Sequence, residues 1–278
     1  MIRVKGWAVI AAVVMLCACG SHGNASEITR ASSAGITTPV TQKQETGWDL
    51  NVSWSLSDEG TLLIEGDGDM PDMFGEAAPW EQYRERIKRV QIAEGVTSIG
   101  SAAFSGCKDL GEVIIPHSVK TIGRSAFYSC VSLEEIAVPD GVLLIADAAF
   151  WECSSLKKVT IGSSVKTIGY NAFCKCTSLE SITLPDGLES IGDCAFEYCR
   201  NLTKISIPSS VTEIGGSAFS CTGGLTITAP EGSKAEEYAK KYGYSYCGSQ
   251  INDTDRRVYY GLPYTPGQAG AGECHRGS

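Results

Sequence analysis

The chain has 278 residues, of which 43% are hydrophobic and 20% are charged, and this is enough for one sizeable domain with flanking segments. Its net charge of −9 and its pI near 4.9 argue against nucleic acid or an anionic lipid surface as the main partner, because both of these are negatively charged.

Residues 1–18 have the features of an export signal. Two basic residues precede the apolar stretch Trp7–Leu16, which is too short for a membrane-spanning helix of about 20 residues. The stretch ends in Leu16-Cys17-Ala18-Cys19, which resembles the lipobox of bacterial lipoproteins. This resemblance implies cleavage before Cys19 and attachment of lipid to its sulfur. The alternative is an ordinary secretory signal that is cut a few residues later, for example after Ala25.

Residues 19–46 are rich in Ser, Thr, Gly and Ala and have almost no bulky apolar side chains. We therefore expect this segment to be a flexible tether that carries the lipid anchor. The other predicted boundaries are an N-terminal cap over 47–86, a repeat region over 87–229, a closing helix and strand over 230–246, and a disordered tail over 247–278.

From Ile87 onward the sequence repeats with a period of 23 residues. Several apolar rows keep this spacing, and such a period of roughly 20–29 residues with Leu and Ile at set positions is the signature of a leucine-rich repeat. Three of these rows are Phe104, Phe127, Phe150, Phe173, Phe196 and Phe219; Ile99, Ile122, Ile145, Ile168, Ile191 and Ile214; and Leu110, Leu133, Leu156, Leu179, Leu202 and Leu225.

Each repeat predicts one coil of a solenoid. In one coil, Ile182 and Leu184 alternate with polar residues, as in a half-buried strand, and a Pro-Asp-Gly turn ends that strand. A second short segment then points Leu188 and Ile191 inward, and Ala195–Phe196 suits one helical turn. We predict a leucine-rich-repeat solenoid of the α/β class, rich in β-structure, with about six coils of parallel stacked strands and a cap at each end.

The front cap is predicted from two segments in which apolar and polar residues alternate on either side of a turn. Val52–Leu56 and Thr61–Glu65 read as a hairpin, and Pro79 starts a short helix. Asp67–Asp72 lacks the acid spacing of a calcium-binding EF-hand loop, so we expect a turn that closes the hairpin.

The back cap is predicted to be a helix. Ser233 and Glu236 form a capping box at its start, and Gly243 follows its last turn.

The repeat Ile-Gly-x-x-Ala-Phe-x-x-Cys-x-x-Leu-x-x-Ile-x-Ile-Pro, seen here over Ile122–Pro139, resembles the BspA-like leucine-rich repeats of bacterial surface proteins. The front segment that starts at Trp48 and the closing helix resemble the same family. Departures are small: Ala146 stands in place of Gly, and Gly162 in place of Pro. The resemblance implies surface display with adhesion or protein binding, and it implies no catalytic residues.

Five cysteines also keep the period: Cys107, Cys130, Cys153, Cys176 and Cys199. Disulfides between adjacent coils or a metal site are one interpretation, but five thiols cannot all pair and no Cys-x-x-Cys motif accompanies them. We expect small apolar side chains inside each coil, and we expect Cys174 and Cys194, which lie off this row, to be more reactive.

The sequence contains no motif that predicts catalysis. The three histidines, His22, His117 and His275, show no metal or triad spacing, and there is neither a Gly-x-Ser-x-Gly motif nor a phosphate-binding loop. We therefore predict that the protein is not an enzyme and that it needs no metal or cofactor.

Aromatic residues stand at positions where the repeat does not demand them. Tyr128 and Trp151 each follow a predicted core Phe in equivalent positions of adjacent coils, so their side chains should point away from the core. Tyr170 and Tyr198 occupy nearby variable positions. We interpret these four residues as candidate ligand-binding residues, because exposed Tyr and Trp are enriched at binding sites. The alternative is that they are scattered surface aromatics.

The sequence thus predicts a non-catalytic binding module that is exported and held at the outer face of the cell envelope by lipid on Cys19. Its expected partner is an extracellular protein or glycan, and nucleic acid is not expected. A structural envelope spacer without a specific ligand is the second hypothesis, and an enzyme accessory domain is a distant third.

Overall fold

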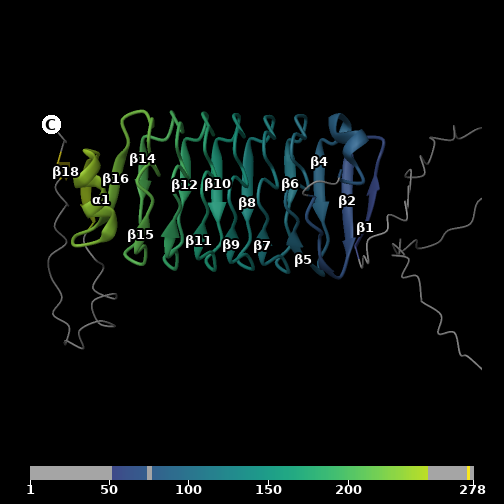
Figure 1. Ribbon diagram of the computed structural model, residues 1–278, viewed down its shortest axis with the longest axis horizontal. Coiled ribbons are helices and arrows are strands. Elements are labelled where there is room, and N and C mark those ends of the chain that lie inside the picture. The colour runs from purple at the N-terminus through teal and green to yellow at the C-terminus, as the bar shows by residue number, and fades with distance from the viewer. Residues whose placement is uncertain (1–51, 74–76, 250–273, 276–278) are drawn as a thin grey trace, which may run out of the picture. The chain divides into compact units, whose positions relative to one another are not determined.

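Two strands in each coil stack into parallel sheets along the repeat region (Figure 1). The computed structural model describes residues 52–73, 77–249 and 274–275, and the predicted export signal, Cys19 and the predicted tether lie outside them. No helix in the part of the chain that the structure describes has both the length and the apolar character needed to cross a bilayer.

The first strand of each coil alternates buried and exposed residues, as predicted. In β10, Val159 and Ile161 are buried while Lys158 and Thr160 face outward. The register joins residues one period apart, so that Val159 pairs with Ile136 of the preceding coil. These strands are β4 (Arg89–Ile92), β6 (Glu112–Ile114), β8 (Glu135–Val138), β10 (Lys158–Ile161), β12 (Ser181–Thr183), β14 (Lys204–Ser206) and β16 (Thr226–Pro230).

The second segment of each coil is also a strand, and these strands form a seven-stranded sheet in the order β15-β13-β11-β9-β7-β5-β3. The row that begins at Ile99 points inward from this sheet and is fully or almost fully buried up to Ile191. The strands are β3 (Gly68–Asp69), β5 (Val96–Ile99), β7 (Thr121–Ile122), β9 (Leu144–Ile145), β11 (Thr167–Ile168), β13 (Ser190–Ile191) and β15 (Glu213–Ile214).

The front cap confirms the predicted hairpin and corrects one detail. Strands β1 (Val52–Leu56) and β2 (Thr61–Gly66) pair antiparallel, and β2 then continues the first sheet in parallel with β4. The predicted short helix is the 3-10 helix η1 (Glu81–Arg86). The turn predicted over Asp67–Asp72 is wrong, because β3 lies there and pairs with β5 as the first strand of the second sheet.

The back cap has the predicted helix, α1 (Lys234–Tyr242). The Ser233 side chain accepts a hydrogen bond from the Glu236 N–H, and Gly243 has a φ of 72°, a left-handed conformation that glycine adopts without strain. Strand β17 (Ser245–Ser249) pairs parallel with β16, and β18 (Cys274–His275) pairs antiparallel with β17. Residues 247–249, which were expected to begin the disordered tail, therefore belong to strand β17.

The third side of each coil is a run of tight turns rather than the predicted helical turn. Around Phe196, both Cys194 and Tyr198 have positive φ values, 55° and 61°, which an α-helix does not allow. The Phe196 N–H donates to the Ala218 carbonyl of the next coil at 2.7 Å. Helical geometry is lost because the N–H groups alternate in direction: Phe196 and Tyr198 donate to carbonyls of the next coil, whereas Glu197 between them donates to Cys194 of the same coil.

A continuous stack of aromatic rings fills the core behind these turns. The six repeat phenylalanines are fully buried, and neighbouring ring centroids are 5.2 to 5.4 Å apart. Trp80 of the front cap stacks on Phe104 at 5.6 Å, and Tyr238 of α1 closes the other end against Phe219 at 5.8 Å. The caps therefore extend the same ring stack that joins the coils.

We predict that Phe150→Ala lowers the free energy of unfolding by about 3–5 kcal/mol, because it removes a buried ring that contacts rings on both sides. Phe150→Leu should cost less, since it keeps most of the apolar volume. Denaturant titration of both variants measures these changes. Equal costs for the two variants would contradict a structure that depends on ring stacking.

Candidate functional site

The turns carry a row of variable side chains, most of them half-buried, while the inward residues of the turns stay nearly constant. We call this row the turn face. It consists of the residues one and two positions after each repeat phenylalanine: Ser105, Gly106, Tyr128, Ser129, Trp151, Glu152, Cys174, Lys175, Glu197, Tyr198, Ser220 and Cys221. The predicted pair Tyr128 and Trp151 belongs to it, and so does Tyr198.

The backbone holds the turn face rigidly. Ser129, Glu152, Lys175 and Tyr198 all have left-handed φ values between 55° and 62°. Each of their N–H groups donates to a carbonyl of the next coil, for example from Glu152 to Cys174 at 2.9 Å. Side chains on this face therefore lose little conformational freedom of the backbone when they bind a partner.

Tyr128 and Trp151 are in contact, as their equivalent positions predict. Their ring centroids lie 5.4 Å apart in an edge-to-face arrangement with an interplanar angle of 76°. Both side chains are half-buried, which differs from the expected outward orientation. The indole Nε1 of Trp151 has no exposed surface and no hydrogen-bond partner. Trp151 therefore contributes to packing as well as to the surface.

Two charged residues complete this cluster, and sequence reasoning missed both. The Lys175 Nζ lies 5.7 Å from the centroid of the Trp151 ring and forms an ion pair with Glu152 at 2.7 Å. The Ser129 hydroxyl donates to the other Glu152 oxygen at 3.0 Å. The Lys175 hydrogen bond is the main reason why the pKa of Glu152 lies below its usual value. The signal available in the sequence was a Glu and a Lys in equivalent positions of adjacent coils.

The other two predicted residues lie outside this cluster and have contacts of their own. Tyr198 stands two coils beyond Glu152 in the same row, and the Arg200 guanidinium lies 5.9 Å from its ring centroid. Tyr170 follows β11 and is 51% exposed, and its backbone N–H donates to the Asp147 carboxylate at 2.9 Å. The structure therefore brings Tyr128 and Trp151 together, while Tyr198 and Tyr170 lie at separate positions.

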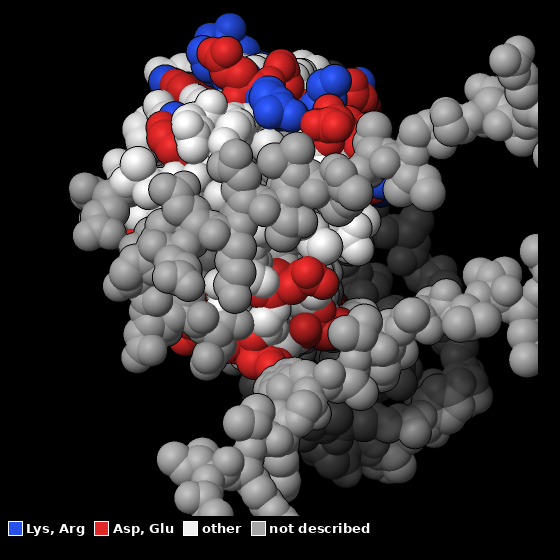
Figure 2. Space-filling model, turned by 90° about the vertical axis from the view of Figure 1, so that its right-hand side faces the viewer, with Lys and Arg blue, Asp and Glu red and all other residues white. Residues whose placement is uncertain are grey.

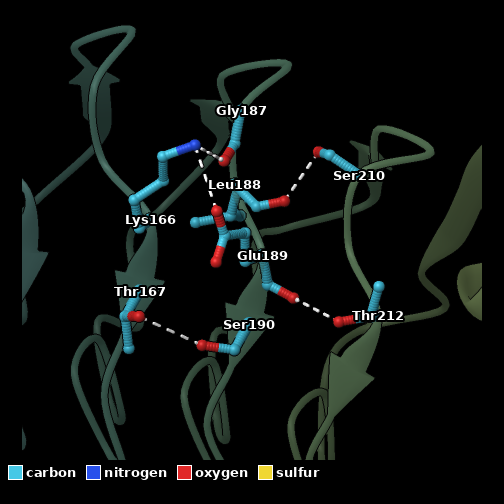
Figure 3. A network of polar contacts seen from close by, with 8 residues as sticks. All are labelled: Lys166, Thr167, Gly187, Leu188, Glu189, Ser190, Ser210 and Thr212. Carbon is cyan, nitrogen blue, oxygen red and sulfur yellow. Dashed lines mark hydrogen bonds and ion pairs between the residues drawn. The ribbon is translucent and has the colours of Figure 1, made fainter.

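The outward side chains of the second sheet mainly link one coil to the next. In Figure 3, the Lys166 Nζ forms an ion pair with Glu189 at 3.1 Å and also donates to the Gly187 carbonyl. The Ser190 hydroxyl donates to Thr167 at 3.2 Å, again across one coil boundary. These contacts satisfy polar groups within the solenoid, so they favour a structural role for this stretch of the face.

The first sheet shows the same kind of linkage. Glu135 and Lys158 are register partners, as predicted. The ion pairs that cross coil boundaries near them are Arg89–Glu112 at 2.6 Å and Lys157–Glu134 at 2.8 Å, and both pairs are solvent-exposed. Exposed pairs of this kind contribute only about 0.2–1 kcal/mol each.

The periodic cysteines are free and buried, which confirms that they are small side chains inside the coils. They also have a polar role. The Cys153 thiol donates to the Phe127 carbonyl of the preceding coil at 3.1 Å, and Cys130, Cys176 and Cys199 make the equivalent contact at 3.2 Å.

The two cysteines off this row are also shielded. Cys174 is buried and Cys194 is half-buried, and burial is the main cause that raises the pKa of their thiols, to about 11 and about 12. This argues against the expectation that they are more reactive, since the thiolate is the nucleophile.

We predict that iodoacetamide modifies Cys221 much faster than Cys153 in the folded protein at neutral pH. Cys221 is exposed, whereas burial raises the pKa of the Cys153 thiol to about 12 and also blocks access to it. Peptide mass spectrometry after timed alkylation measures both rates, and alkylation in denaturant serves as the control that makes the two sites equivalent. Similar rates in the folded state would mean that the coil interior is open to solvent.

Residues that hold metals in other proteins do not gather here. Within residues 52–73 and 77–249, no group of three or more His, Cys, Asp or Glu side chains is placed to hold a metal ion. The arrangement on the turn face, with two aromatic rings beside a paired Glu and Lys, suits recognition by contact rather than bond-making chemistry.

The repeat pattern and the stacked coils agree with a known family. The family described as BspA type leucine rich repeat region matches residues 82–176 and 144–252 of the chain, in six copies. The chain belongs to this family. Its fold as a parallel-strand leucine-rich-repeat solenoid follows from the family and from the coils described above.

Solved structures of other leucine-rich-repeat proteins are similar to this chain. A leucine rich cell surface protein from Faecalibacterium prausnitzii is 32% identical, with a TM-score of 0.51, over 66% of this chain and 54% of that one. A leucine-rich repeat protein from Bacteroides ovatus is 27% identical, with a TM-score of 0.45, over 66% of this chain and 60% of that one. The BspA-type chain thus spans little more than half the length of these relatives. A comparison with curated proteins finds no match.

Proposed function

We propose that this BspA-type repeat protein is a non-catalytic binding module that is displayed on the cell surface and recognises an extracellular protein or glycan through its turn face. The observation that carries the proposal is the contrast between constant inward residues and variable outward residues in the same turns. Phe127 and Phe150 repeat without change, while the positions after them hold Tyr128 and Trp151 in contact with each other.

The composition of the cluster supports recognition of a polar partner. Two half-buried rings offer apolar contact, and the Glu152–Lys175 pair beside them offers both hydrogen-bond acceptors and donors. The family and the Faecalibacterium prausnitzii relative, which is described as a cell surface protein, support display outside the cell.

The proposal includes a lipid anchor on Cys19. The support for it is the sequence alone: the cysteine ends the apolar core of the export signal in a lipobox context. Two or more acyl chains on one protein suffice for stable membrane attachment, whereas one chain gives only marginal binding. The segment from Cys19 to the first cap would then serve as the tether.

We predict that Cys19→Ala releases the protein from the membrane fraction into the medium or the soluble fraction, because it removes the sulfur that would carry lipid. Fractionation followed by immunoblotting measures the distribution, and Cys17→Ala, two residues away in the same signal, is the matched control. Unchanged membrane retention of the Cys19 variant would show that the protein is held by something other than this anchor.

We predict that the double variant Tyr128→Ser and Trp151→Ser weakens ligand binding by at least about tenfold, or 1.4 kcal/mol. A glycan array and a panel of immobilised extracellular proteins identify the ligand first, and a titration with that ligand measures the loss. Because Trp151 is half-buried, the double variant must also be compared by thermal unfolding.

Two controls separate binding from packing. Trp151→Phe keeps an aromatic ring and removes the buried Nε1–H that lacks a partner, so it should preserve stability. Ile114→Ser changes a residue that is 43% exposed on the first sheet and should leave binding intact. Normal binding by a folded double variant would place the site elsewhere, and no ligand on either panel would favour the spacer hypothesis.

A further inference from the structure

A hollow lies at the front of the second sheet, and none of the turn-face residues line it. Its volume is about 420 Å³, within the range of about 300–1,000 Å³ that is usual for small-molecule pockets. The end of β3 and the segment after it form one wall, and the residues that flank β7, two strands further along the sheet, form the other. Hydroxyl-bearing residues of β5 and β7, among them Ser98 and Thr121, lie between the two walls.

The first wall is acidic and its carboxylates are held in place. The Asp69 carboxylate accepts a hydrogen bond from the Thr97 hydroxyl at 2.6 Å, and the Asp72 carboxylate accepts one from the Ser101 N–H at 2.7 Å. The wall itself is fixed by its backbone, since Met73 donates to the Ser101 carbonyl at 2.8 Å, and its side chain is buried. Asp69 also accepts a hydrogen bond from the Ser98 side chain, so both carboxylates are held by residues of the neighbouring coil.

Further acidic residues near this wall add to its negative charge. Figure 2, the view onto the β1 end, shows Asp and Glu side chains gathered on the lower part of the surface, whereas Lys and Arg mix with them at the top. The front segment contributes the exposed residues Glu65, Asp67, Asp69 and Asp72. Because these acidic residues follow one another closely in the sequence, a positively charged group is favoured near Asp69 and Asp72.

The opposite wall carries positive charge. Lys120 is exposed, lines the hollow and forms no ion pair with any residue that the structure describes, unlike Lys166, which binds Glu189 two coils further along the same sheet. Its backbone is fixed by a hydrogen bond from its N–H to the Thr97 carbonyl at 2.8 Å. Arg124 lies on the same wall.

We propose that this hollow binds a small zwitterion of the α-amino-acid type, with its ammonium group at Asp69 and Asp72 and its carboxylate at Lys120. A neutral ligand with separated charges matches two walls of opposite sign, and the hydroxyls between them suit its polar backbone. A simple anion would be repelled by the acidic wall, and a simple cation would leave Lys120 without a partner. The site is independent of the turn face, so it does not rest on the function proposed above.

The test uses the intact chain and three related probes: L-serine, N-acetyl-L-serine, which lacks the ammonium, and L-serinamide, which lacks the carboxylate. Titration followed by NMR measures the affinity of each. We expect L-serine to bind and both derivatives to bind at least about tenfold more weakly, a difference of 1.4 kcal/mol. D-glucose and D-glucuronate are added to probe for a neutral or acidic sugar.

Variants locate the binding. Lys120→Gln and Asp69→Asn should each weaken L-serine binding by at least about tenfold, and Lys158→Gln, a lysine in the first sheet, should not. All three residues are exposed, and thermal unfolding verifies that the variants fold. Equal binding of L-serine and its derivatives, binding that survives Lys120→Gln, tighter binding of a sugar, or no binding of L-serine would each overturn the proposal.

Discussion

The stacking of one phenylalanine ring on the next in every coil is the contact on which the rest of this structure depends. Because the rings repeat at 5.2 to 5.4 Å and are fully buried, each coil must present the same residue at the same height. Within the ring stack, a change of one residue in the length of a coil would move its ring out of line with its neighbours. From Phe104 to Phe219 the period of 23 residues is therefore a packing requirement. Beyond the last ring of this row the spacing can shorten, and Ile205 pairs with Ile227.

The stack also explains the unusual backbone of the turns. Non-glycine residues in the left-handed conformation cost about 1–2 kcal/mol each. The turns accept this cost at positions such as Ser125, Glu152 and Lys175 because it lets N–H groups reach carbonyls of the next coil. Four cysteine thiols add a further link, since Cys130, Cys153, Cys176 and Cys199 each donate to the carbonyl of a stacked phenylalanine. The hydrogen bonds between coils thus fix the coils relative to one another, although several residues must adopt an unfavourable left-handed conformation.

A scaffold fixed in this way leaves its outward positions free to vary. On the turn face this freedom supports an aromatic pair with a Glu–Lys ion pair, and on the second sheet it supports a hollow between walls of opposite charge. The aromatic pair is not needed for stacking, because other coils hold Ser105 or Ser220 at the equivalent turn-face position. Both features lie on rigid backbone, which lowers the entropy cost of binding a partner.

The sequence by itself determined the inward half of the molecule. The rows of Phe, Ile and Leu predicted the solenoid, the strand positions and the burial of the periodic cysteines, because burial at a fixed period is a local property of the chain. They predicted about six coils, whereas the second sheet has seven strands, because β3 of the front cap adds one. The capping box of α1 and the front hairpin could also be predicted, because both depend on residues that are close in the sequence. The contact between Tyr128 and Trp151 also followed from their equivalent positions.

Only the tertiary structure decided how outward groups meet. The left-handed turns depend on hydrogen bonds between residues about one period apart, so local propensity predicted a helical turn instead. Lys175, one coil away, lies over the Trp151 ring, and this contact exists only in the stacked coils. The hollow forms between Asp69 of the cap and Lys120 of a later coil. These two residues are far apart in the sequence, and they line the same hollow only because the coils stack.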